Sequence, residues 1–161
     1  MKKRTEYAIN TDETYKKERD YIAKNDLSVI TKAKDLCDYI MTITDKSPKR
    51  FRFTLVSRLQ NYALDVIENL IRANETFVSA GDALSQRERL GFQRKAMTSL
   101  KLLGYISELA MKQGCILPKQ YEQITKHVYD TENMLGAWMN SDRKRYGQEP
   151  SGNGMRNKEN G

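Results

Sequence analysis

Cysteine, histidine and proline are scarce in this chain, which has two, one and three of them among 161 residues. Cys37 and Cys115 belong to no CxxC motif and no Cys/His cluster, so the sequence indicates neither a zinc site nor a disulfide framework. His127 has no histidine or cysteine at ligand spacing and no recognisable nucleophile nearby in sequence. We therefore expect no metal and no catalytic residue, and two cysteines that act as small apolar residues in a reducing compartment.

Nucleotide-binding and di-iron motifs are also missing. The chain has no GxxxxGK(S/T) loop, no GxGxxG sequence and no ExxH pair. Gly91 and Gly104 fall inside a helical pattern, where we expect them to permit close approach of a neighbouring helix rather than to bind phosphate. The sequence thus predicts a protein that is not an enzyme and that uses no cofactor.

A long apolar run is the third feature that the chain lacks. Its positively charged start, residues 1–4, is followed by no apolar segment of the kind found in a secretion signal. Nowhere do about 18 apolar residues follow one another, as a membrane-spanning helix requires. We expect a soluble, cytoplasmic protein with no membrane partner.

Charge is what the chain has in abundance. Lysine and arginine number 28 against 21 acidic residues, which gives a net charge of +7, and 30% of all residues are charged. A basic balance favours polyanions or acidic protein surfaces as partners. The 39% hydrophobic content and the length suit one folded domain.

Four segments repeat apolar residues at the helical period of 3.6, over residues 27–44, 48–74, 83–113 and 118–140. Residues that suit helix ends bound these segments: Asp26, Ser47, and Asp82 or Ser85 as N-caps, Pro48 and Pro118 at first helical positions, and Gly114 at a left-handed stop. None of the four helices can bury its apolar stripe alone. The pattern predicts an all-α, antiparallel up-down-up-down four-helix bundle, because the proline and glycine interruptions argue against one continuous coiled coil.

The polar ends are expected to lie outside the bundle. Residues 1–26 mix charges with three tyrosines and few aliphatic residues, which predicts a partly disordered arm. Residues 27–140 form the predicted bundle. Residues 141–161, rich in glycine, asparagine, arginine and lysine, predict a flexible basic tail.

Two apolar rows lie off the main stripes of the second and third segments: Leu64 with Ile71, and Leu102 with Leu109. They indicate either a wider core or a subunit interface. Apolar residues aligned on a second face more often mark an interface. We therefore expect a homo-oligomer.

A row of cations follows the third segment, nearly opposite its core face. At about 100° per residue, its members share one side of the helix and are Arg87, Arg94, Lys101 and Lys112, with Tyr105 in line and Arg89 and Lys95 flanking. Such a row is either a solvated face or a ridge that contacts phosphates. Seven basic against two acidic residues between positions 84 and 119 favour nucleic-acid binding, which releases counterions and is therefore salt-sensitive.

A second basic cluster occupies the turn into the second segment and comprises Lys46, Lys49, Arg50 and Arg52, with Arg58 one turn later. Its charges either keep the turn soluble or bind nucleic acid. Phe51 and Phe53 interleave with them, and we expect both rings to cap the end of the bundle.

The second and fourth segments carry familiar sequences. They are Ser47–Leu55 (SPKRFRFTL), then Arg58-Leu59 and Ala63-Leu64-Asp65, and later Leu117–Glu122 (LPKQYE) and Met134–Trp138 (MLGAW). Together these resemble the accessory variability determinant (Avd) family of diversity-generating retroelements, within the small bacterial four-helix proteins that include those encoded in ribosomal RNA intervening sequences. The resemblance covers about Leu27 to Asn140 and rests mostly on structural residues.

This resemblance implies a pentameric barrel of four-helix protomers with a basic surface. It implies binding to the element's reverse transcriptase and template RNA, so that the template is copied into adenine-mutagenised cDNA that diversifies a target gene. Polymerisation would reside in the partner. Phosphate-binding roles carry over only as a class, to the basic residues already named.

Two other functions compete with this one. The first is a ribosomal-RNA-associated bundle without a polymerase partner, and the second is a protein–protein adaptor. A reverse transcriptase and a template/variable repeat pair beside the gene would favour the retroelement.

Overall fold

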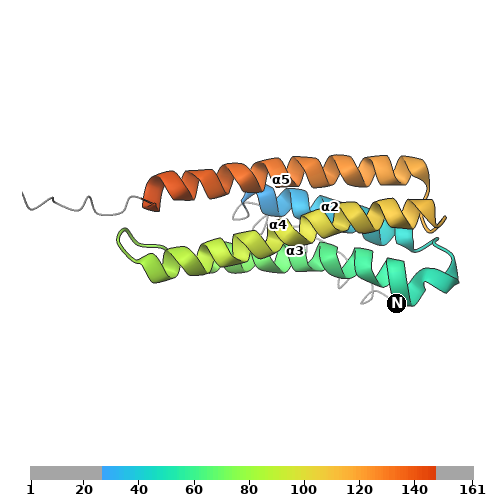
Figure 1. Ribbon diagram of the computed structural model, residues 1–161, viewed down its shortest axis with the longest axis horizontal. Helices are drawn as coiled ribbons and strands as arrows, with labels where there is room; N and C mark the ends of the chain where they lie inside the picture. Colours follow the sequence, from blue (N-terminus) through green and yellow to red (C-terminus); the bar gives the residue numbers. More distant parts are fainter. Residues whose placement is uncertain (1–26, 148–161) are drawn as a thin grey trace, which may run out of the picture.

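The computed structural model describes residues 27–147, and every regular element in that range is helical (Figure 1). The main helices are α2 (Ser28–Thr44), α3 (Ser57–Glu75), α4 (Ala83–Lys112) and α5 (Pro118–Tyr146). A 3-10 turn, η1 (Lys49–Phe51), and a π-helical turn, η2 (Arg52–Val56), lead into α3. The predicted all-α class is therefore confirmed for the described part of the chain.

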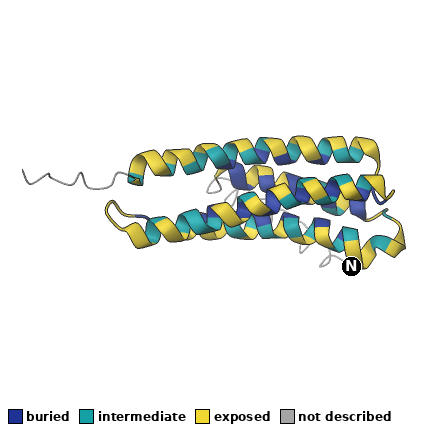
Figure 2. Ribbon diagram, viewed as in Figure 1, coloured by how far each residue is buried: buried dark blue, intermediate teal, exposed yellow. Residues whose placement is uncertain are grey.

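The four helices enclose one core. Helix α3 packs against α2 and α4, and α5 packs against α2 and α4, so each helix has two neighbours. Their buried faces turn inward and their exposed faces outward (Figure 2). The stripes expected from the 3.6 period form this core, whose largest fully buried apolar residues are Ile30, Leu36, Ile40, Leu59, Val66, Leu70, Leu100, Leu103, Ile124 and Leu135.

Several helix ends lie where the sequence predicts them. The Asp82 carboxylate accepts hydrogen bonds from the backbone N–H groups of Leu84 and Ser85 and so caps α4. Gly114, with φ of 73°, follows α4 in the left-handed region that glycine adopts without strain. Pro118 is the first residue of α5.

The start of the second helical region differs from the prediction. Pro48 precedes the 3-10 turn instead of opening an α-helix, and regular α-geometry begins only at Ser57. The Ser47 hydroxyl caps no helix. It donates a hydrogen bond to the carbonyl oxygen of Cys115, 2.9 Å away, and so ties this turn to the α4–α5 loop.

Two further expectations are corrected. Residues 141–146, assigned to a flexible tail, belong to α5, while the arm at 1–26, the Asp26 cap and residues 148–161 lie outside the described residues. Among residues 27–147, a Cβ added at Gly91 or Gly104 would meet no atom of a neighbouring element within 4 Å, so these glycines do not serve close packing between the described helices.

Candidate nucleic-acid interface

The basic ridge predicted on the third segment is exposed along α4. Arg87, Arg94 and Lys101 are exposed to solvent, and the first and last are 14 positions apart, which corresponds to about 21 Å of helix axis at 1.5 Å per residue. The ion pairs seen within residues 27–147 are Arg72–Glu68, Arg89–Asp142 and Lys112–Glu108. None of the three ridge cations is among them, so within the described residues none of the three forms an ion pair with a carboxylate.

Lys95 and Lys112 are placed differently from the rest of the ridge. The Lys95 ammonium lies 5.4 Å from the centroid of the Phe92 ring, at the edge of the ridge. The Lys112 ammonium bonds to Glu108, whose hydrogen bond and negative charge raise the pKa of Lys112 above its ordinary value. Lys112 is therefore the weakest of the predicted phosphate contacts.

Arg89 has a structural position rather than one beside the ridge. Its guanidinium donates to the Thr76 carbonyl oxygen at 2.6 and 3.1 Å and lies 3.5 Å from the Asp142 carboxylate. The same carboxylate accepts a bond from the amide nitrogen of the buried Gln93 at 2.8 Å. These contacts fasten the end of α5 to the first half of α4 and to the α3–α4 loop.

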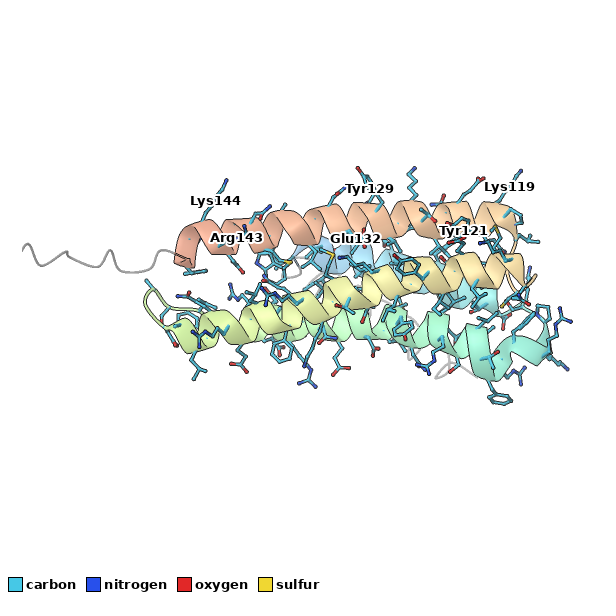
Figure 3. All side chains as sticks on the ribbon, in the orientation of Figure 1. Lys119, Tyr121, Tyr129, Glu132, Arg143 and Lys144 are labelled. Carbon is cyan, nitrogen blue, oxygen red and sulfur yellow. The ribbon has the colours of Figure 1, made fainter. Side chains whose placement is uncertain are left out.

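Three cations that were not predicted from the sequence as site residues lie at this end of α5. Arg143, Lys144 and Arg145 are exposed on its last turns, and Arg143 shares a cleft with Arg94 of α4. In Figure 3, Arg143 lies on the α4 side of α5 and Lys144 points away from α4. A signal was present in the sequence, because Leu135, Met139, Asp142 and Tyr146 continue the helical spacing past residue 140.

The second basic cluster lies at the opposite end of the bundle from the α3–α4 loop (Figure 1). Its residues Lys49, Arg50, Arg52 and Arg58 are all exposed. The Arg50 guanidinium lies 4.6 Å from the centroid of the Phe51 ring, and Phe51 packs against the core as expected of a cap. Phe53 does not, since 88% of its surface is exposed. The fold therefore separates the two predicted clusters.

The two cysteines are buried, and His127 packs beside side chains of α2 and α5. Burial raises the pKa of both thiols above the ordinary cysteine value; the neighbouring Asp38 adds to the rise at Cys37, and the Ser47 hydroxyl beside Cys115 opposes it there. His127 lies between Gln123, 3.1 Å from its Nε2, and the Tyr39 ring.

Residues 27–147 contain no group of three His, Cys, Asp or Glu side chains placed to hold a metal ion. Within the same range no helix has both the length and the apolarity of a membrane span.

The apolar rows expected at an interface are mostly uncovered. Leu64, Ile71 and Leu109 are 48%, 39% and 44% exposed, while Leu102 is half-buried. A wider internal core would have buried all four. The structure thus leaves apolar surface on the outer sides of α3 and α4.

Comparison of the chain with protein-family models and with curated protein sequences finds no match.

Proposed function

We propose that this protein is a non-catalytic accessory factor of a diversity-generating retroelement, which binds template RNA and the reverse transcriptase and so supports mutagenic cDNA synthesis. The RNA-binding part rests on a group of exposed cations on two adjoining helices. Arg87, Arg94 and Lys101 of α4 and Arg143 of α5 have no carboxylate partner in the described residues. The retroelement and its polymerase are proposed from the motif resemblance.

Unpaired surface cations in a row suit a phosphate backbone. Each phosphate that they neutralise releases condensed counterions, and this release favours binding without reading the sequence. A helix held by a packed core keeps these charges at fixed spacing, and Arg89, Gln93 and Asp142 hold the two helices together at this end. The ridge is therefore suited to hold an RNA strand for a separate polymerase.

Assembly is the second part of the proposal. We propose an antiparallel up-down-up-down bundle that associates into a homo-oligomer, a pentamer as in the family it resembles, through Leu64, Ile71, Leu102 and Leu109. Cross-helix hydrogen bonds support the bundle order, since Gln60 of α3 bonds to Thr44 at the end of α2. Exposed leucine and isoleucine at helical spacing support the interface.

The decisive experiment removes the ridge charges. The triple variant Arg87→Gln, Arg94→Gln, Lys101→Gln should bind unrelated single-stranded RNAs more weakly by a similar factor. The slope of its salt dependence should be shallower by roughly 0.7 for each phosphate that the variant no longer neutralises. Filter binding over a series of salt concentrations measures both. In a reconstituted reaction with the reverse transcriptase, the variant should also fail to support cDNA synthesis on the template RNA.

A matched control removes equal charge elsewhere. Lys32, Lys119 and Lys126 are exposed on α2 and α5, away from the ridge, and their triple change to Gln should reduce affinity much less. Equal reductions in the two triples would mean that only net charge matters. Unchanged affinity in the ridge variant would show that the ridge is merely solvated.

A further inference from the structure

A cleft of about 250 Å³ opens between the first half of α4 and the last turns of α5, beside the α3–α4 loop. Its walls are mostly apolar and come from Val78, Leu90, Met139 and Tyr146. Pockets for drug-sized ligands measure roughly 300 to 1,000 Å³. The cleft therefore suits a group that is smaller than a drug-sized ligand and has an apolar face.

The polar groups of this cleft are of two kinds, namely inner groups that pair with one another and exposed arginines. Gln93 and Asp142 lie among its lining residues, bonded to each other, and Arg89 compensates the negative charge of Asp142. Arg94 and Arg143 line the same cleft from opposite helices and form no ion pair within residues 27–147. Positive charge beside an apolar hollow favours a ligand that is anionic and also has an apolar face.

We propose that this cleft holds one unpaired base of a bound RNA strand, with the flanking phosphates on Arg94 and Arg143. The inference rests on the proposed RNA binding and adds a preference for unpaired nucleotides. A base in the cleft would lie against the half-buried ring of Tyr146, and aromatic stacking accepts any base. A paired base cannot enter, because its faces are covered by its neighbours in the duplex.

The test uses a short RNA with 2-aminopurine at its centre, offered to the full chain as a single strand and as a duplex with its complement. On binding of the single strand, fluorescence should fall because the base stacks. Tyr146→Ala should weaken single-strand binding about tenfold and abolish the fluorescence change, leaving duplex binding unaltered. Tyr146→Phe should keep both.

Two more variants control for effects of Tyr146→Ala that have nothing to do with base binding. Leu90→Trp fills the cleft from α4 and leaves the sequence of α5 unchanged, so it should reproduce the weaker binding even if Tyr146→Ala frays the end of α5. Tyr129→Ala removes an exposed tyrosine of α5 that points away from α4 (Figure 3) and should change nothing.

The possible failures differ from one another. If the wild type binds RNA with steep salt dependence, yet neither cleft variant alters binding or fluorescence, the cleft proposal is wrong and RNA binding stands. If neither RNA form binds, both proposals fail. If 2-aminopurine ribonucleoside monophosphate binds as tightly as the strand, the cleft is a site for free nucleotides instead.

Discussion

Asp142 shows how one residue decides the geometry of the candidate site. Its side chain and that of Arg89 are each only 15% exposed, and Asp142 also accepts the Gln93 amide bond. A mostly buried carboxylate with two such partners is held in position, and its removal leaves the buried Gln93 amide without this acceptor and the Arg89 charge without its counter-ion. The Arg72–Glu68 pair on the surface of α3, with side chains 56% and 58% exposed, has no such role.

Asp142→Ala should therefore lower the free energy of unfolding by about 1 to 3 kcal/mol, because the buried Gln93 amide loses its acceptor and Arg89 keeps only its bonds to Thr76. Glu68→Ala is the control and should cost about 0.5 kcal/mol or less, as exposed helix pairs do. Urea denaturation followed by circular dichroism measures both. Similar destabilisation in the two variants would contradict a structural role for Asp142.

The first turn of α4, where the ridge begins, is capped by the side chain of Asp82. Asp82 accepts bonds from the N–H groups of Leu84 and Ser85, at the end of the helix where partial positive charge accumulates. The backbone and side chain of Ser85, and then the Leu84 N–H, lower the pKa of the Asp82 carboxyl. A pKa below the value in the unfolded chain means that the ionised form stabilises the fold.

The cap should make stability depend on pH in a definite direction. The contribution of ionised Asp82 is complete above the unfolded pKa of about 3.9 and is lost as pH falls through the lower folded pKa. The stability difference between wild type and Asp82→Ala should thus shrink on acidification. Asp82→Asn keeps a neutral cap, so its advantage over Asp82→Ala should be the same at neutral and acidic pH. Thermal melts across this range test it, and a constant wild-type advantage would refute the charge effect.

At the scale of the whole molecule, the bundle presents cations at both ends and apolar residues on the outer sides of α3 and α4. Leu64 and Leu109 are nearly half exposed, so a charged side chain at either position reaches water without entering the core. A charged substitution at these exposed positions therefore tests an interface without disturbing the core. The same substitution at the half-buried Leu102 would also disturb internal packing.

Leu64→Glu and Leu109→Glu should each lower the molar mass in solution while helicity is retained, because a charge in an apolar interface opposes association. Size-exclusion chromatography with light scattering over a wide concentration range gives the mass. Tyr129→Glu, on an exposed position of α5, is the control. A wild type that is monomeric at the highest concentration would contradict the proposed oligomer.

The sequence by itself determined the four helices and their core faces, because burial selects apolar residues at a period of 3.6 whatever the neighbours are. It also determined a cap at Asp82 or Ser85, of which the structure shows Asp82, and the Gly114 stop, because both depend on local chemistry. Only the tertiary structure decided what depends on contacts between helices. Asp142 of α5 meets Arg89 and Gln93 of α4, and these contacts accompany a helix that continues to Tyr146, where the composition predicts a tail. They bring Arg143 beside Arg94. At the other end of the bundle Phe53 is exposed, because no element of the described chain covers it.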